Sequence, residues 1–377
     1  DYSQQSNRGD NMTKWLRRKP ANISHLKTHP ALSGLSDITL QILVGRGYTT
    51  PEQIEKFLFG GIKDLHDPRK MKDAELAVSM IQKAIENGDF ITVYGDYDCD
   101  GVTSTAITTM LLEKAGAKVG YFTNNRFLHG YNMCPQGIDD LLALYPDTKL
   151  IVTVDNGISG HEGVKYAKEK GIQVIVTDHH DPADTLPPAD AVVNPKRQDC
   201  TYPFKHLCGA GVAFKLMLLL YWEMGLPLQD VYDTMDIAAL GTVADIVPLE
   251  DENRIIVSLG LKMIQEERRD VFRILRQVTQ VKQINAHHTI GFIYAPIINA
   301  IGRLDGDSRR AIDMFFETDE TKIEDTVRYL VEINEIRKQM TEEQTEKADQ
   351  LLNQKGLQYV NVIYHPNFHE GIVGGFW

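Results

Sequence analysis

The apolar positions between Phe90 and Asn194 fall into short β-branched runs that alternate with stretches of helical period. Short apolar runs are typical of buried strands, and strands that alternate with helices indicate a parallel α/β sheet. The predicted strands are Ile91–Tyr94, Val119–Phe122, Leu150–Val154, Gln173–Thr177 and Ala191–Val193.

Acidic residues follow three of the predicted strands. Asp96 comes after the first strand, Asp155 after the third and Asp178 after the fourth. The carboxyl ends of parallel strands meet at one edge of a sheet, and ligands bind there. We therefore expect the three acids to converge on one crevice.

Helical periodicity describes most of the remaining chain. Residues from Ile38 to about Asn87 read as helical, with Thr50 as an N-cap and Pro51 in the first turn of one helix. Residues 210–290 are also mostly helical. Thr321 to about Asn353 predicts one long helix, whose first half carries an apolar stripe of Ile323, Val327, Leu330 and Ile336.

The second half of this long helix, Thr341 to Lys347, is polar on every side. Such a helix is expected where the chain crosses solvent between two domains. A strand predicted at Tyr359–Tyr364 would begin the second domain, but about 20 remaining residues are too few for a core. We therefore expect the second domain to be truncated in this sequence.

The fold class is thus α/β, with a helical N-terminal region, a parallel-sheet domain, a long helix and the beginning of a second α/β domain. We expect a leader or cloning remnant at 1–11, the helical region at 12–88, the sheet domain with a helical insertion at 89–318, the connecting helix at 319–355 and the second domain from 356 to 377.

Composition narrows the classes of partner. The 377 residues contain 40 Lys and Arg against 52 Asp and Glu, a net charge of −12, so a polyanion needs a local basic patch or bound cations. The longest apolar run, Leu216 to Trp222, falls far short of the ~18 residues of a membrane span. We therefore expect no membrane partner. Four cysteines without a CxxC pair suggest a reducing cytoplasm.

The first chemical motif is YGDYDCDG, from Tyr94 to Gly101, which places Asp96, Asp98 and Asp100 between a strand and a helix. Carboxylates this close repel one another unless cations lie among them, and dense oxygen ligands favour a hard divalent metal. A surface calcium-type loop, or a helix N-cap with spare acids, is the plainer alternative for this motif alone.

Three further segments add candidates. VDNG around Asp155 is by itself a common turn. It becomes a candidate site segment because it directly follows a predicted strand of the same sheet. In TDHH, His179 and His180 follow Asp178, and imidazole beside carboxylates suits Mn²⁺, Fe²⁺ or Zn²⁺ better than Mg²⁺ alone. Asp245 in GTVADIVPL is enclosed by apolar residues, so it is either paired, for example with Arg254, or bound to a metal.

In this order, GDYDCDG, VDNG, TDHH and GTVADIVPL resemble the motifs of the DHH phosphoesterase superfamily. Residues 30–95, LCGAGVAFKL (207–216) and NAIGRL (299–304) are similar to the RecJ family of single-strand-specific DNA exonucleases. The resemblance runs from about His29 to Gly374. It implies a DHH catalytic domain followed by a substrate-binding domain of DHHA1 type.

The resemblance further implies a two-metal site that uses Mn²⁺ most readily, with Mg²⁺ as the other candidate. His180 would face the scissile phosphate, Asp155 would bridge the metals, and Asp178 would orient the histidines from behind. The catalytic set is Asp96, Asp98, Asp100, Asp155, His179, His180 and Asp245, of which all except His180 are metal ligands.

Contacts to nucleic acid are implied for Arg303, Arg309 and Arg310, and for His369, Gly371 and Gly374 in the glycine-rich segment near the end. A second basic stretch is either a path for a phosphate backbone or a solvated helix face. It comprises Lys262, Arg268, Arg269, Arg273, Arg276 and Lys282.

We therefore expect a metal-dependent 5′-to-3′ exonuclease of single-stranded DNA that acts in repair and recombination. It would be a monomer, with a single-strand-binding protein or a helicase as a further partner. One alternative is a DHH relative that cleaves short oligonucleotides or small nucleotides. The other alternative is a non-catalytic replisome scaffold. This alternative is disfavoured because every expected metal-ligand position carries a residue that can bind a metal. The 5′ polarity comes from the resemblance alone.

Overall fold

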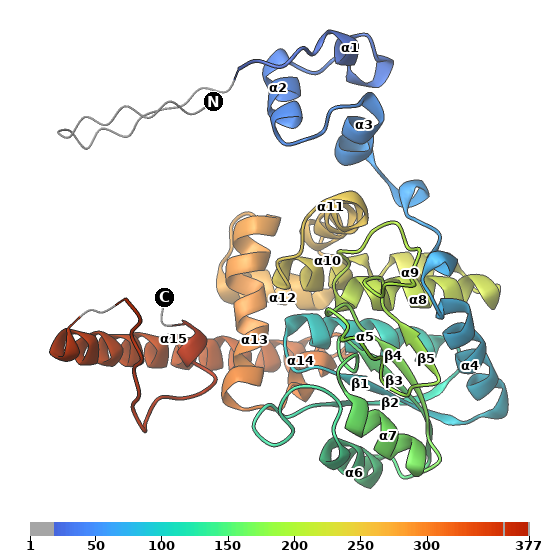
Figure 1. The fold of residues 1–377 in the computed structure, drawn as a ribbon, viewed down its shortest axis with the longest axis vertical. Coiled ribbons are helices and arrows are strands. Elements are labelled where there is room, and N and C mark those ends of the chain that lie inside the picture. The colour runs from blue at the N-terminus through green and yellow to red at the C-terminus, as the bar shows by residue number, and fades with distance from the viewer. Residues whose placement is uncertain (1–18, 357–358, 376–377) are drawn as a thin grey trace. The chain divides into compact units, whose positions relative to one another are not determined.

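The computed structural model describes residues 19–356 and 359–375 (Figure 1). The predicted leader at 1–11 lies outside the described residues. The chain divides into two units, a helical unit that ends at Gly60 and a main unit that begins at Gly61.

The helical unit has a small core of its own. Its elements are α1 (Ser24–Lys27), η1 (Pro30–Leu32), α2 (Asp37–Gly45) and α3 (Pro51–Phe59). The predicted start of α3 is confirmed: Thr50 is the N-cap, its hydroxyl accepts a hydrogen bond from the Gln53 amide, and Pro51 occupies the first turn. The core consists of Ile23, Leu26, Leu32, Leu40, Leu43 and Ile54.

A five-stranded parallel sheet forms the centre of the main unit, as the sequence predicts. The strands lie in the order β2-β1-β3-β4-β5, and all four neighbouring pairs are parallel. They are β1 (Phe90–Gly95), β2 (Lys118–Thr123), β3 (Thr148–Val154), β4 (Gln173–Thr177) and β5 (Ala191–Val193).

Helices cover both faces of the sheet (Figure 1). The helices α4 (Ala74–Asn87), α5 (Cys99–Lys114) and α8 (Gly209–Glu223) contact one another or the sheet on one side, and α6 (Pro135–Leu144) pairs with α7 (His161–Glu169) on the other. Successive strand residues enter different cores: Val93 packs with α5 and α8, and Tyr94 packs with α6 and α7. Strands buried on both faces read as continuous apolar runs, which is why the sequence shows them clearly.

The helical insertion and the long helix follow the sheet. They comprise α9 (Leu228–Tyr232), α10 (Met235–Ala244), α11 (Asp251–Gln265), α12 (Asp270–Thr279), the π-helical η4 (Ala286–Tyr294), α13 (Ala295–Leu304), α14 (Arg309–Asp313) and α15 (Glu320–Lys355). Short 3-10 turns are η2 (Ile62–Asp64), η3 (Pro68–Lys70) and η5 (Val373–Gly375).

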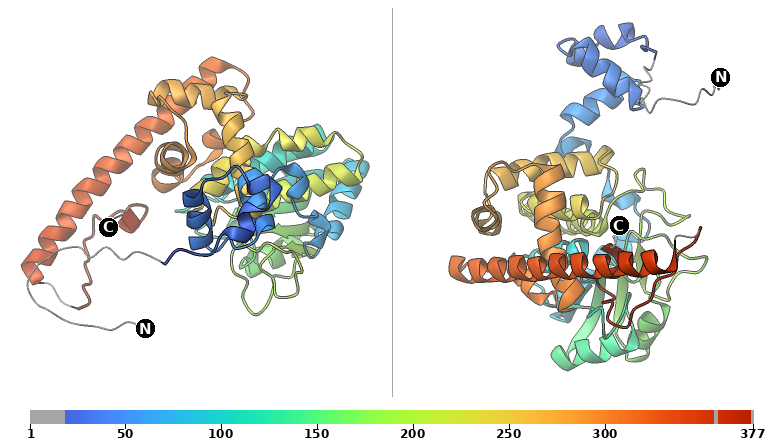
Figure 2. Two further views of the ribbon diagram at one scale, coloured as in Figure 1. Left: turned by 90° about the horizontal axis from the view of Figure 1, so that it is seen from above. Right: turned by 90° about the vertical axis from the view of Figure 1, so that its left-hand side faces the viewer.

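The first half of α15 packs against α12 and α13 through Ile323, Val327 and Leu330, which are buried as predicted. Ile336 is exposed, so its place in the predicted stripe is wrong. At 3.6 residues per turn the stripe continues at Asn334, which is buried, and Ile336 lies two residues off that face. In the left-hand view of Figure 2 the second half of α15 extends beyond the helices that pack against its first half.

The strand predicted at Tyr359–Tyr364 is absent from the structure. These residues are irregular, and Tyr359, Val360, Val362 and Tyr364 are exposed. The alternation of the segment suits a strand, but a strand needs a neighbour for its backbone hydrogen bonds, and the described residues supply none. None of the described helices combines the length and apolar character that a membrane span requires.

A buried ion pair connects α8 and α11. The Lys215 ammonium lies 2.7 Å from the Glu252 carboxylate, and both side chains are fully buried. The same carboxylate accepts hydrogen bonds from the His66 amide at 2.8 Å and from the Tyr202 hydroxyl. Glu252 therefore fixes the segment before α4 against two helices of the core.

We expect Glu252→Ala to lower the free energy of unfolding by about 3–5 kcal/mol, because it leaves the buried Lys215 ammonium without its carboxylate partner. Chemical denaturation would measure the loss. The double variant Lys215→Met/Glu252→Leu is the control and should lose less than Glu252→Ala alone. A Glu252→Ala protein within about 1 kcal/mol of the parent would contradict this account of the pair.

Candidate metal centre

The strand order reverses at β1, because β2 lies on one side of it and β3 on the other. Ligands of open parallel sheets bind at the carboxyl ends of the strands that flank such a reversal. The ends of β1 and β3 are register partners through Gly95 and Val154, so Asp96 and Asp155 emerge side by side. The predicted convergence of acidic strand ends is confirmed.

Two helix N-termini point at these acids. Asp98 is the N-cap of α5, and its carboxylate accepts a hydrogen bond from the Gly101 amide at 3.0 Å. Asp100 accepts from the Gly209 and Ala210 amides at 2.6 Å and 2.9 Å, at the start of α8. The capping role that was the plainer alternative for Asp98 is therefore real, and it holds the side chain within the acidic cluster.

Asp155 adopts a left-handed backbone conformation with φ of 59°. This conformation is uncommon outside glycine, although aspartate tolerates it better than most residues. The start of α8 approaches it closely: a Cβ at Gly209 would lie 2.5 Å from the Asp155 Cβ and 2.6 Å from its Oδ1. Only glycine at 209 allows the Asp155 carboxylate its place.

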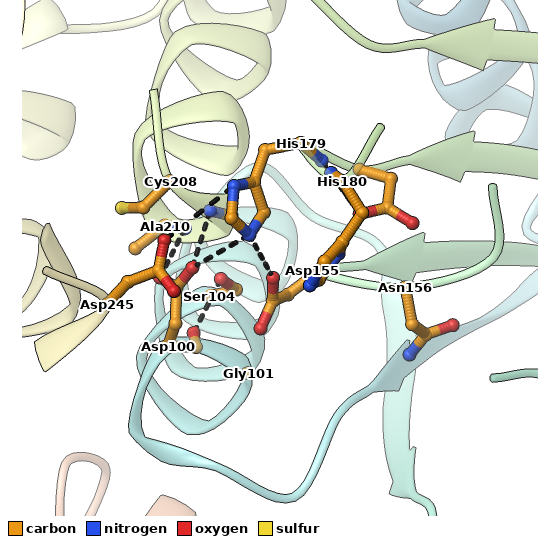
Figure 3. Close-up of polar contacts among 12 residues, drawn as sticks. Asp100, Gly101, Ser104, Asp155, Asn156, His179, His180, Cys208, Ala210 and Asp245 are labelled. Carbon is orange, nitrogen blue, oxygen red and sulfur yellow. Dashed lines mark hydrogen bonds and ion pairs between the residues drawn. The ribbon is translucent and has the colours of Figure 1, made fainter. Parts of the chain in front are cut away.

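The His179 ring lies among three carboxylates (Figure 3). Its Nε2 is 3.0 Å from Asp155 Oδ1 and 3.6 Å from Asp100 Oδ2, and its Nδ1 is 3.7 Å from Asp245 Oδ2. Burial lowers the pKa of His179, so the ring is neutral, which is the form that binds metals. Neither ring nitrogen has a hydrogen-bond partner among the described residues.

His180 is held differently from His179. Its Nδ1 lies 2.7 Å from Asp178 Oδ1, and its side chain is 56% exposed. The hydrogen bond with Asp178 raises the pKa of His180 to about 9, so the ring is a cation at neutral pH. Although burial opposes it, the bonds from His180 and from the Ile158 amide lower the pKa of Asp178, which remains a carboxylate.

The electrostatics of the cluster favour a cation. Burial, followed by repulsion from neighbouring carboxylates, raises the pKa of Asp96 and of Asp245 to about 8 and also raises the pKa values of Asp98 and Asp155. Asp96 Oδ1 and Asp155 Oδ1 are buried without a hydrogen bond among the described residues. Oxygen atoms left in this way fit ligation of a divalent metal.

The ligand atoms form three overlapping groups, within each of which all atoms lie within 4.8 Å of one another. Asp155 belongs to two of the groups and His179 to two. The groups are Asp96, Asp98 and Asp155; Asp100, His179 and Asp245; and Asp155, Asp178, His179 and His180. The structure thus brings together every sequence-predicted metal ligand.

A cavity of about 290 Å³ opens beside Asp98, Asp100 and Asp245. The Arg126 guanidinium lies over the rings of Tyr97 and Tyr131, 5.6 Å from each centroid. The sequence predictions missed these three residues, because a single arginine in a polar loop has no periodicity or motif to mark it. The remaining lining residues are Cys99, Ala244, Ile246, Asn299 and Arg303.

The sequence prediction also did not include Asn299 as a site residue, although Asn299 belongs to the NAIGRL motif. Its Oδ1 accepts a hydrogen bond from the Cys99 amide at 2.6 Å and so satisfies a free donor at the start of α5. Arg303, from the same motif, lines the cavity as predicted for a nucleic-acid contact. Burial, and then the charge of Arg303, lower the pKa of the Arg337 side chain, so two guanidinium groups lie near each other at this end of the cavity.

The other candidates for nucleic-acid contact lie in two places. His369 and Gly371 are next to Arg303: Arg303 Nη1 donates to the Gly371 carbonyl at 3.4 Å, and His369 packs edge-on against Phe127. Arg309 and Arg310 begin α14 and are exposed, and the Arg310 guanidinium covers the Tyr329 ring. These two arginines and Gly374 are not among the residues that line the cavity.

The second basic stretch is largely neutralised by neighbouring acids, as expected of a solvated face. Arg269 pairs with the buried Asp236 at 2.9 Å, and Arg273 lies 3.0 Å from both Asp270 and Glu320. Arg268 pairs with Glu266, and Arg276 pairs with Glu267.

Comparison with known proteins defines the class first. The model of the DHH family, N-terminal domain, matches residues 90–242, which contain the sheet and five of the six proposed metal ligands. The chain is a DHH protein.

Curated relatives and solved structures then define the family of this chain among the DHH proteins. It is 37% identical over 343 residues to the single-stranded-DNA-specific exonuclease RecJ of Bacillus subtilis, and 34% identical over 362 residues to RecJ of Escherichia coli. These alignments cover 90% of this chain and 42% and 61% of the relatives, so the chain spans about half the length of the proteins it matches.

A crystal structure of exonuclease RecJ bound to manganese superposes with a TM-score of 0.72 at 33% identity, covering 81% of this chain and 76% of that one. RecJ of Thermus thermophilus in complex with Mn²⁺ gives a TM-score of 0.77 at 29% identity, over 94% of this chain and 49% of that one. The chain belongs to the RecJ family.

We expect Gly209→Ala to weaken binding of a divalent cation at least tenfold without removing any ligand, because its methyl group would displace the Asp155 carboxylate. Mn²⁺ titration followed by electron paramagnetic resonance would measure the change. Gly211→Ala, in the same helix turn, is the matched control: its Cβ would meet only the Leu207 side chain, at 3.2 Å. Equal Mn²⁺ affinity in both variants would contradict the proposed contact.

Proposed function

We propose that this chain is a metal-dependent 5′-to-3′ exonuclease that hydrolyses phosphodiester bonds of single-stranded DNA in repair and recombination. The observation that carries the proposal is the cluster of Asp and His ligands that opens directly into a cavity lined by arginine and tyrosine side chains. The names of the curated relatives supply the substrate and the family supplies the polarity.

We assign two divalent ions to the cluster. Asp96, Asp98 and Asp155 would hold one ion, Asp100, His179 and Asp245 would hold the other, and Asp155 would bridge them. The manganese and magnesium complexes of RecJ structures support either metal, and the imidazole ligand favours Mn²⁺. Bound divalent ions supply Lewis-acid activation of water and offset the charge that develops on the phosphoryl oxygens.

His180 would bind the scissile phosphate. Its ring carries a proton on each nitrogen at neutral pH, and Asp178 holds Nδ1, so Nε2 is the donor that faces outward. A positively charged donor fixed by a carboxylate can hold a phosphate oxygen through the reaction, because its orientation needs no rearrangement. Asp178 is therefore a positioning residue for His180.

The cavity would take one nucleotide at the end of a single strand. The exposed ring of Tyr131 would stack on a base, and Arg126 and Arg303 would offer guanidinium groups to phosphates. Arg337, His369 and Gly371 lie around Arg303 and would extend the phosphate path, and Arg309, Arg310 and Gly374 are proposed as contacts further along the strand.

The proposal includes a monomeric, cytoplasmic protein that works with a single-strand-binding protein or a helicase. All four cysteines, which lie within the described residues, are free thiols, and this supports a reducing compartment.

The test of function is a degradation assay on 5′-labelled and 3′-labelled single strands, with Mn²⁺, Mg²⁺ or EDTA. We expect mononucleotides to be released from the 5′ end with Mn²⁺, no cleavage in EDTA, and no cleavage of blunt duplexes or of single-stranded circles. Cleavage of circles would refute an end-on path. Cleavage of only very short oligonucleotides would favour a small-substrate enzyme, and no cleavage with intact Mn²⁺ binding would favour a scaffold.

The two histidines should respond differently to substitution. His180→Ala should reduce turnover by at least a hundredfold with nearly unchanged metal content, because it removes a phosphate contact and no ligand. His179→Ala should reduce metal content and turnover together. Metal analysis and steady-state rates of the purified variants would separate these effects, and the reverse pattern would exchange the two roles.

A further inference from the structure

Ile246 has an unusual backbone conformation at the edge of the proposed active site. It directly follows Asp245, the C-cap of α10, and its φ is 58°. Its amide donates to the Val243 carbonyl at 3.3 Å, so it occupies the position after a helix end where glycine or asparagine is usual. A β-branched residue is an outlier in this left-handed region.

The other positions with a left-handed backbone conformation show that an isoleucine at such a position is exceptional. Among the described residues, the other non-glycine positions with positive φ carry Asp, Asn, Glu or Gln, and Ile246 is the single β-branched one. Ile246 is also 89% exposed, so burial of its side chain does not offset the strain. Neither local conformation nor packing explains an isoleucine here, and strain of this kind gathers at functional sites.

The surrounding loop fixes the direction of the side chain. Val243 and Val247, on either side, pack against the main core. The Asn253 side-chain amide donates to the Pro248 carbonyl at 3.0 Å and to the His206 carbonyl at 2.6 Å, which ties the loop to the start of α11. Because the backbone is held before and after Ile246, its side chain is presented outward as a fixed apolar surface.

That surface forms part of the wall of the cavity beside the metal ligands. The cavity offers guanidinium groups, which suit phosphate, and the exposed ring of Tyr131, which suits a base. Ala244 and Ile246 supply its aliphatic wall. The part of a nucleotide that lacks charge and a π-face is the sugar, whose C–H groups pack well against aliphatic carbon.

We propose that Ile246 contacts the sugar of the nucleotide that occupies this cavity and so contributes to substrate binding. The inference rests on the proposed function, since it requires a nucleotide there. It explains why an isoleucine occupies a position at which glycine would be more stable.

The test compares Ile246→Gly, Ile246→Val and the parent protein on 5′-phosphorylated single strands with Mn²⁺. Ile246→Gly should lower kcat/KM roughly 5- to 10-fold, mainly through KM, because one aliphatic contact is lost. It should also raise Tm by roughly 2–4 °C, because the strain is relieved. Ile246→Val should stay within about twofold of the parent, since the apolar branched surface remains.

Gln280→Gly is the matched control for strain. Gln280 caps α12 with φ of 55°, is exposed, and lies outside the cavity lining. It should gain thermal stability in the same way with unchanged kinetics. Mn²⁺ affinity should be unchanged in all variants, and a loss in Ile246→Gly would mean that the residue acts on the Asp245 ligand and not on the substrate.

A substrate with an abasic nucleotide at its 5′ end distinguishes a contact to the sugar from a contact to the base. If Ile246 contacts the sugar, the ratio of kcat/KM between parent and Ile246→Gly stays the same on abasic strands. A ratio that falls to one would assign the contact to the base and overturn the inference. A parent protein that cleaves no single strand would refute the proposed function, whereas an active parent equal to Ile246→Gly would refute this inference alone.

Discussion

Mutual repulsion among buried carboxylates is the constraint on which the rest of the site depends. Folding brings five aspartates to one end of the sheet, Asp96, Asp98, Asp100, Asp155 and Asp245. Burial and the neighbouring carboxylates raise the pKa values of Asp96, Asp98, Asp155 and Asp245 and so disfavour their charged forms. The protein offsets part of this cost with the N-termini of α5 and α8, whose amides bond Asp98 and Asp100. Bound protons or metal ions would offset the remainder.

The sheet makes this crowding sustainable. Its strands are buried on both faces, and the two helical layers hold the carboxyl ends of β1, β3 and β4 at fixed spacing. The packing at this end of the sheet is tight. Asp155 has a left-handed backbone conformation, and a single methyl group at Gly209 would not fit against it. A less rigid framework would let the carboxylates move apart, and the cation affinity would be lost.

Patterns that are local in sequence were predictable. Each strand is a short apolar run, so the sheet and the convergence of Asp96, Asp155 and Asp178 at its carboxyl edge could be derived from the sequence pattern. The other proposed ligands lie on or beside helices or were named from the family resemblance. Arg126, Tyr131 and Asn299 could not be derived from the sequence, because long-range packing alone brings them to the cavity. The error at Tyr359–Tyr364 has the same origin, since its alternation is strand-like but strand formation depends on a distant partner. The error at Ile336 was local and arose from a departure from helical period.

A net charge of −12 is compatible with the proposed polyanionic substrate, because the arginines beside the cavity differ from the other arginines in their ion pairing. Arg268, Arg269, Arg273 and Arg276 are paired with acids, which removes most of their long-range field. Among the described residues, Arg126 and Arg303 form no ion pair and instead face tyrosine rings and a backbone carbonyl. Arg126 and Arg303 would therefore attract phosphate at the cavity itself. In the proposed function, a strand end would be held there by short-range contacts, whereas duplex DNA, which presents its charge along a broad surface, would meet a predominantly acidic protein.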